Sequence, residues 1–167
     1  MSDPENPEVE AVKESVSERR ARLRRAARLS AVQAMYQMEM SGQGAKNVVR
    51  QFRDHRFGHD QEPGDYIEAD EDFFEDLLQG IVERQDEVDG LIKGALRQGW
   101  RLSRLDATVR AILRSGGYEL LARQDVPTKT VINEYIDIAH AFFEGSEPGF
   151  VNGTLDTLAK QVRQGAA

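Results

Sequence analysis

The densest group of residues able to do binding chemistry is a run of arginines near the start of the chain. In 167 residues with a formal net charge of −7, six arginines fall within ten positions. They are Arg19, Arg20, Arg22, Arg24, Arg25 and Arg28. Like charges this close repel one another and gain nothing from folding, so they indicate a polyanionic partner. RNA is the most plausible polyanion, because guanidinium groups form bidentate hydrogen bonds with phosphates and also stack on bases.

Helical spacing would align part of this cluster with an aromatic ring. Arg20, Arg24 and Arg28 fall at intervals of four residues along one side of a helix, with Arg25 beside them. Tyr36 lies two turns beyond Arg28 on a neighbouring line. Aromatic rings are stacking platforms for unpaired bases, so this face suits single-stranded RNA. The alternative is a helix face that is merely solvated.

A second candidate patch lies near the end of the chain, at residues 150–156. The segment reads FVNGTLD and places an amide and a glycine inside an apolar helical stretch. Asn152 can cap or crosslink helices by hydrogen bonds, and Gly153 can allow close approach of another backbone.

Catalytic and metal-binding readings have less support. His55 and His59 are four residues apart, which would place both imidazoles on one helix face, but Gly58 lies between them. An exposed histidine pair is therefore the favoured interpretation. The sequence contains no cysteine, no phosphate loop and no nucleophile with an evident base. We expect no catalytic residue, no metal and no cofactor.

Composition and charge limit the class of protein. No apolar run approaches the roughly 20 residues of a membrane span, and the acidic first residues are unlike a signal peptide. We therefore expect a cytoplasmic protein with no membrane partner. Residues 1–15 read as a disordered acidic tail, and residues 16–167 as one domain. Between residues 60 and 89, thirteen carboxylates stand against one arginine.

The apolar residues recur with helical spacing almost throughout, which predicts an all-α fold of six or seven helices. The first helix should run from a cap at Ser17 to Gly42, and a second should cover residues 45–57, followed by a loop to residue 68. A third segment, capped by Asp70 or Asp72, should break into two helices around residues 85–90. Further helices should begin at Ser103 or Asp106, after Pro127, and after residues 144–149.

Five motifs in this order resemble the bacterial transcription antitermination factors of the NusB family. The motifs are RRAAR at 24–28 followed by AVQAMY at 31–36, AILR at 111–114 with YEL at 118–120, DVP at 125–127, VINE at 131–134 and FVNG at 150–153. Any one of them is weak, but five in register are highly specific. The resemblance covers approximately residues 19–163.

The resemblance implies an all-helical fold of about seven helices in two packed three-helix subdomains, with an arginine-rich first helix. It also implies that residues 16–167 are an RNA-binding domain that recognises the single-stranded boxA element of nascent ribosomal RNA leader transcripts. The partner would be the ribosomal protein NusE, in a heterodimer acting on the RNA polymerase elongation complex with other Nus factors. The implied RNA contacts are Arg24, Arg25, Arg28, Gln33, Tyr36, Phe150 and Asn152.

The sequence departs from the family pattern in three places, and each bears on the RNA contacts or partners that the resemblance implies. The acidic tail could fold back on the arginines and compete with RNA, and the loop at 145–149 lacks the charged pattern that often precedes FVNG. Ser115-Gly116-Gly117 replaces larger helix formers at a cost of about 1 kcal/mol per glycine relative to alanine. We interpret these small residues as a sign of tight contact with another helix, and a homodimer that hides the RNA surface is one form that this contact could take.

Two other classes stay open. The same helical module occurs in RNA methyltransferases as an accessory domain, although no cofactor domain is present in this sequence. Alternatively, the chain is a helical dimerisation module whose arginines meet an acidic protein surface.

Overall fold

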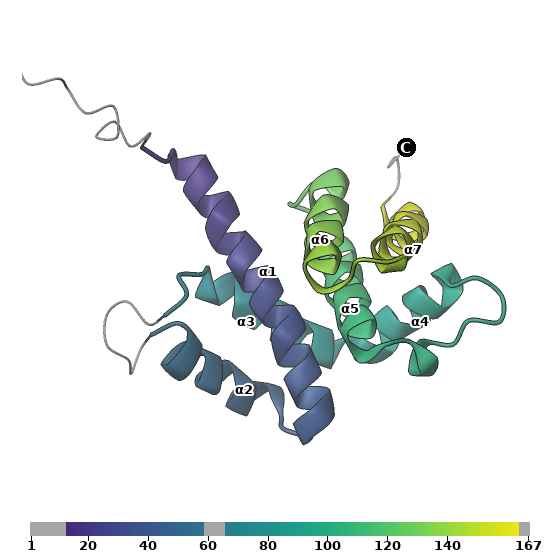
Figure 1. The fold of residues 1–167 in the computed structure, drawn as a ribbon, viewed down its shortest axis with the longest axis horizontal. Coiled ribbons are helices and arrows are strands. Elements are labelled where there is room, and N and C mark those ends of the chain that lie inside the picture. Colours follow the sequence, from purple (N-terminus) through teal and green to yellow (C-terminus); the bar gives the residue numbers. More distant parts are fainter. Residues whose placement is uncertain (1–12, 59–65, 164–167) are drawn as a thin grey trace, which may run out of the picture.

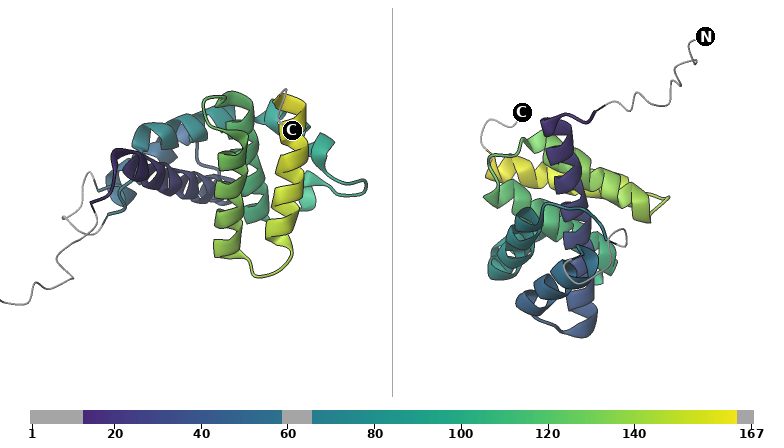
Figure 2. Two further views of the ribbon diagram at one scale, coloured as in Figure 1. Left: turned by 90° about the horizontal axis from the view of Figure 1, so that it is seen from above. Right: turned by 90° about the vertical axis from the view of Figure 1, so that its left-hand side faces the viewer.

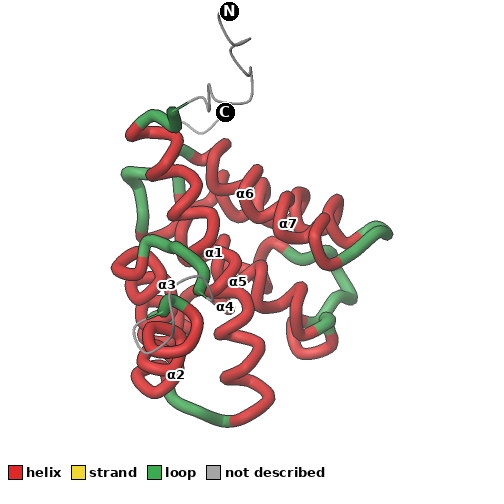
Figure 3. The backbone as a smooth tube through the Cα atoms, turned by 60° about the vertical axis from the view of Figure 1, so that its left-hand side comes forward, coloured by secondary structure: helices red, strands yellow, loops and turns green. Residues whose placement is uncertain are grey.

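The computed structural model describes residues 13–58 and 66–163, and within these ranges it contains helices and loops but no strand (Figure 3). The seven α-helices of the described residues are α1 (Val16–Ser41), α2 (Ala45–Gln51), α3 (Glu71–Glu83), α4 (Gln85–Ala95), α5 (Ala107–Ala122), α6 (Thr128–Phe142) and α7 (Glu147–Val162). The predicted all-α fold is confirmed. None of the helices between residues 13 and 58 or 66 and 163 is long and apolar enough to cross a membrane.

The helices form two groups that meet at α5 (Figures 1 and 2). Helices α1, α2 and α3 pack together, and α4 to α7 form the second group. Helix α5 packs against α1 and α3 on one side and against α4, α6 and α7 on the other. Its apolar stripe supplies fully buried Ile112, Leu113 and Leu120 to the core. Burying each such side chain contributes about 1.5–3 kcal/mol.

Side-chain caps fix where several helices begin. Helix α1 is capped by Ser15, whose hydroxyl accepts a hydrogen bond from the Glu18 amide at 3.1 Å, so the predicted cap at Ser17 was wrong. The spacing of Ser15 and Glu18 matches the capping-box pattern. The stop at Gly42 is confirmed, because this residue has a φ of 73° and donates its amide to the Met38 carbonyl.

Aspartate side chains cap two further helices. Asp70 caps α3 and Asp106 caps α5, while Ser103 lies in a 3₁₀ turn, η3 (Leu102–Arg104). The predicted break in the third segment occurs at Arg84, between α3 and α4. The second predicted helix is α2 continued by a π-helical turn, η2 (Phe52–Arg56).

The start of α7 differs from the prediction, and two other predicted segments lie largely outside the described residues. Helix α7 begins at Glu147, earlier than predicted, because Pro148 suits the first helical turn, where no amide donor is needed. The predicted acidic tail and the loop before residue 68 lie largely outside the described residues, which omit 1–12 and 59–65.

The small residues of α5 mark a tight helix contact inside the subunit. A Cβ atom added at Gly116 would lie 2.9 Å from Leu155 Cδ1 and 3.2 Å from Tyr135 Cδ2, and both of these side chains are fully buried. At Gly117 an added Cβ would lie 3.3 Å from Leu158. Glycine at these positions lets α6 and α7 approach α5 closely, which offsets its low helix propensity.

We expect Gly116→Ala to lower the free energy of unfolding by about 1–3 kcal/mol, because the added methyl group overpacks a core that cannot yield. Gly90→Ala is the matched control, since Gly90 lies in α4 with no atom within 4 Å of an added Cβ. It should raise the free energy of unfolding by about 0.5–1 kcal/mol. Urea unfolding followed by circular dichroism measures both. Equal effects of the two substitutions would contradict the packing argument.

Candidate nucleic-acid interface

The arginines of α1 are largely paired with carboxylates from other parts of the fold. Five of the six form an ion pair with a described residue. The pairs are Arg19 with Glu68 at 2.7 Å, Arg22 with Glu14 at 2.8 Å, Arg24 with Asp70 at 3.7 Å, Arg25 with Glu134 at 3.1 Å and Arg28 with Glu119 at 2.6 Å. The expectation that the cluster gains nothing from folding was therefore wrong, because acidic residues, four of the five distant in sequence, offset the repulsion.

The side of α1 that carries Arg20, Arg24 and Arg28 passes from solvent into the core. Arg20 is exposed and has no ion pair among the described residues, whereas the Arg24 side chain is 16% exposed. Arg28 is buried, with 3% of its side chain exposed. Successive turns of one helix face thus differ in access, because α1 enters the contact with α3 and α5 along its length.

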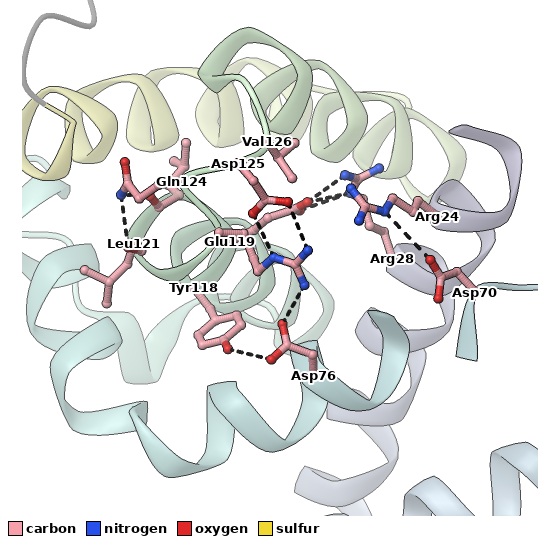
Figure 4. Close-up of polar contacts among 12 residues, drawn as sticks. Arg24, Arg28, Asp70, Asp76, Tyr118, Glu119, Leu121, Gln124, Asp125 and Val126 are labelled. Carbon is pink, nitrogen blue, oxygen red and sulfur yellow. Dashed lines mark hydrogen bonds and ion pairs between the residues drawn. The ribbon is translucent and has the colours of Figure 1, made fainter. Parts of the chain in front are cut away.

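Arg28 is committed to Glu119 of α5 in the interior (Figure 4). Its Nε donates to both carboxylate oxygens at 3.0 Å, and a second nitrogen donates to Oε1 at 2.6 Å. Burial by itself lowers the pKa of Arg28, but the hydrogen bonds and charge of Glu119 raise it overall. A phosphate could reach this guanidinium only by displacing Glu119 inside the core. This geometry does not favour the predicted RNA contact of Arg28.

Arg24 and Arg28 also surround the ring of Phe73, which begins the apolar stripe of α3. The guanidinium carbons of Arg24 and Arg28 lie 4.6 Å and 5.1 Å from the ring centroid. Arg123, at the end of α5, lies 5.0 Å from the same centroid. Arg24 keeps a buried Nε with no hydrogen-bond partner in the described structure, so it is only partly satisfied by Asp70. Three cations on one buried ring tie α1, α3 and α5 together.

Arg25 faces outward and remains available. Its side chain is 59% exposed, and it donates two hydrogen bonds to Glu134 of α6 at 3.1 Å and 3.2 Å. These hydrogen bonds and the charge of Glu134 raise the pKa of Arg25. An exposed pair of this kind contributes about 0–1 kcal/mol to stability. A phosphate can therefore compete with Glu134 for the guanidinium.

Gln33 and Tyr36 continue along α1. The side-chain oxygen of Gln33 accepts a hydrogen bond from Arg56, which links α1 to η2. Tyr36 has an exposed ring, as a base-stacking role requires. Gln33 is thus engaged inside the fold, whereas Tyr36 is accessible.

The residues predicted near the start of α7 differ in their surroundings. Phe150 is half-buried and packs its ring against Trp100, with centroids 5.1 Å apart and planes tilted by 32°. Asn152 is exposed. Gly153 has no atom within 4 Å of an added Cβ, so the expected close backbone approach was wrong.

Only one member of the predicted histidine pair lies in the described residues. His55 is exposed on η2, and His59 lies outside the described ranges. Among residues 13–58 and 66–163, no group of three or more potential ligands is placed to hold a metal ion.

Comparison with known proteins assigns the chain to a family. The sequence matches the NusB family over residues 25–160. The transcription antitermination protein NusB of Maricaulis maris is 62% identical over 153 residues, which cover 92% of this chain and 96% of that protein. The same protein of Caulobacter vibrioides is 53% identical, with 89% and 99% covered. This chain belongs to the NusB family.

Solved structures agree with this assignment. T. maritima NusB is 29% identical and superposes with a TM-score of 0.69, covering 82% of this chain and 90% of that one. A crystal structure of antitermination factors NusB and NusE in complex with dsRNA matches with a TM-score of 0.64 over 82% of this chain and 96% of that one. At 21% identity, the second match shows the shared fold alone.

The structure of this NusB-family chain also reveals residues that the sequence reasoning missed. Trp100 is exposed in the connector between α4 and α5, and it is the partner of Phe150. Arg97, Arg101 and Arg104 lie in the same connector. Their alternation with the only tryptophan, in the run RQGWRLSR, was a visible signal of a basic and aromatic patch.

A further network, at the end of α5, holds the chain that enters α6. Arg123 donates to Asp125 at 3.0 Å and to Asp76 of α3 at 3.1 Å. The hydrogen bonds from Arg123 hold the pKa of Asp125 at about 2. The DVP motif of the family resemblance therefore begins with a residue that anchors the turn between α5 and α6.

We expect Arg28→Ala to lower the free energy of unfolding by about 3–5 kcal/mol, because Glu119 would be left charged and unpaired in the core. The control is Arg25→Ala, which removes an exposed pair on the same helix and should cost less than about 1 kcal/mol. Chemical unfolding measures the free energy of unfolding of both variants and of the unchanged protein.

A double variant that removes both charges tests whether the lost stability comes from an unpaired Glu119. Replacing Arg28 by Met and Glu119 by Leu removes both charges and should recover much of the stability lost in Arg28→Ala. If Arg28→Ala were as stable as Arg25→Ala, the ion pair would have no structural role and Arg28 would again be a candidate phosphate contact.

Proposed function

We propose that this chain is a transcription antitermination factor that binds the single-stranded boxA element of nascent ribosomal RNA leader transcripts together with NusE. In this proposal, residues 16–167 form the RNA-binding domain. The protein acts in the cytoplasm and joins the RNA polymerase elongation complex with other Nus factors. It contributes no catalytic group and serves as an assembly adaptor.

The observation that carries the proposal is the exposure of cations on the first turns of α1, in a protein of net charge −7. Arg19, Arg20, Arg22 and Arg25 are all exposed, and these turns extend beyond the other helices (Figure 1). The carboxylates that pair with Arg19 and Arg22 are themselves accessible to water. Solvent screens such pairs, so phosphates of an RNA strand can replace those carboxylates.

The role of each predicted contact follows from its position. Arg25, Tyr36, Phe150 and Asn152 are accessible or half-buried and are the proposed contacts with RNA. Arg24 is a weaker candidate because most of its side chain is covered. Arg28 and Gln33 are engaged with Glu119 and Arg56, and we assign them to positioning α1.

The solved NusB and NusE factors in complex with dsRNA support the choice of partners. In that structure a chain with the same fold was crystallised in an assembly of NusB, NusE and dsRNA, and the present chain carries accessible cations and rings suited to RNA. A protein-only dimerisation module would not require a base-stacking ring.

Salt dependence of RNA binding tests the first part of the proposal. If three or four arginines each neutralise a phosphate, log affinity should fall against log salt with a slope of about −2 to −3. Replacing Arg20 and Arg25 by Gln should reduce the magnitude of this slope by about 1.4. Fluorescence anisotropy of an end-labelled boxA RNA measures it.

The matched control is a double variant that loses two arginine charges at positions away from α1. Arg50 and Arg84 are exposed arginines on α2 and at the start of α4, and replacing both by Gln should leave the slope unchanged. Equal slopes for the two double variants would place the RNA away from α1.

The second part of the proposal concerns the protein partner. Titration of this chain with NusE should give a one-to-one complex by analytical ultracentrifugation, and the complex should bind boxA RNA more tightly than either protein alone. A scrambled RNA of equal length is the control for sequence. A self-associated dimer that neither NusE nor RNA dissociates would contradict the proposal and favour the homodimer alternative.

A further inference from the structure

The connector between α4 and α5, residues 96–106, carries cations that the fold leaves unpaired. The side chains of Arg97, Arg101 and Arg104 are exposed and form no ion pair or hydrogen bond with any residue in the described ranges. This contrasts with α1, where most arginines have a carboxylate partner. Unpaired guanidinium groups gathered on one short segment are available to an anionic ligand without breaking existing contacts.

Trp100 stands in the middle of these cations. Its amide donates to the Arg97 carbonyl at 3.0 Å across a turn in which Gly99 has a φ of 90°. Turns of this type need positive φ at the third position, so glycine fixes where the ring is presented. The Trp100 side chain stays 55% exposed although it packs against Phe150. One aromatic surface is therefore open and already held in place.

Trp100 also lies between two grooves. On one side a groove of about 700 Å³ is lined by Trp100, Phe150, Arg97 and Arg104. On the other side a groove of about 710 Å³ is lined by Trp100, Arg101 and Glu39 of α1. Both volumes fall within the range of ligand sites. Phe150, a proposed RNA contact of α7, lines the first groove, and Glu39 of the second groove is one turn from Tyr36 on α1.

The acidic residues of the first groove are mostly engaged. Asp106 accepts hydrogen bonds from the amides of Thr108 and Val109 as the cap of α5, and Asp156 pairs with Lys160 at 3.2 Å. Glu147 retains a carboxylate oxygen with no hydrogen-bond partner in the described structure. Such an acceptor suits the amino group of a base and repels a phosphate, so bases should face Phe150 while phosphates follow the arginines.

We propose that Trp100 and Phe150 form a base-stacking platform for single-stranded RNA, with Arg97, Arg101 and Arg104 binding the phosphates on either side. This inference rests on the proposed function and extends the RNA path from α1 and α7 across the α4–α5 connector. Alternating arginines and aromatic rings are the usual composition of surfaces that bind single strands without reading every base.

The single tryptophan makes the platform directly observable. Trp100 is the only tryptophan of the chain, so its intrinsic fluorescence reports this site alone. Stacking on a base should quench that fluorescence as boxA RNA is added, in parallel with the anisotropy of an end-labelled RNA. Heparin, a polyanion without bases, is the control and should bind the cations without the same quenching.

Substitutions separate stacking from charge. Trp100→Ala should weaken RNA binding about 5- to 100-fold, and Trp100→Phe should restore most of the affinity. Replacing Arg101 and Arg104 by Gln should reduce the magnitude of the salt slope by about 1.4, while the Arg50 and Arg84 double variant leaves it unchanged. Circular dichroism should report unchanged helicity, because all three side chains lie on the surface.

The outcomes distinguish this inference from the proposed function. If RNA binding quenches the fluorescence of Trp100 and Trp100→Ala loses RNA affinity, the result supports both the platform and the proposed function. RNA binding without quenching, together with an unaffected Trp100→Ala variant, overturns the platform and leaves the proposed function standing. Absence of RNA binding overturns both. A Trp100→Ala variant that loses NusE binding but keeps RNA affinity would also overturn the platform and make the connector a protein interface.

Discussion

The buried ion pair between Arg28 and Glu119 is the constraint on which the arrangement of this molecule depends. It joins α1 to α5, the helix against which α3, α4, α6 and α7 also pack. Both groups are desolvated, so removing either one would leave the other charged and unpaired in the core, and their hydrogen bonds favour the observed position of α1 along α5. The exposed first turns of α1 are held in place by this internal anchor.

The arginines of α1 therefore divide into two kinds. Toward the core, Arg24 and Arg28 surround Phe73 and hold helices together. On the exposed faces of α1, Arg19, Arg20, Arg22 and Arg25 lie in solvent, and the ion pairs of Arg19, Arg22 and Arg25 are screened and exchangeable. One short sequence motif thus serves both stability and ligand binding, and the role of a given arginine depends on its place along α1 and on whether its face of the helix points toward Phe73 and α5.

The exposed arginines that this NusB-family chain is proposed to use for RNA lie in two separate places, the first turns of α1 and the α4–α5 connector. Grooves on both sides of Trp100 link the connector to α1 and α7. A single strand that follows this path would meet exposed rings as well as positive charge. Such a surface needs no enclosed pocket and no catalytic group, which is consistent with a protein that assembles a complex.

Much of the fold was predictable from the sequence, because helix periodicity, caps and stops are local properties of the chain. The all-α fold and the stop at Gly42 followed from residues and their neighbours, the cap at Asp70 was one of two candidates, and the glycines at 116 and 117 indicated tight contact with a helix that the sequence did not identify. The motifs likewise identified the family. The tertiary structure alone decided that Arg28 is buried and that Trp100 meets Phe150. The first contact joins residues that are 91 positions apart in the sequence, and the second joins residues that are 50 positions apart. No local pattern specifies which carboxylate or ring a side chain will contact after the helices pack.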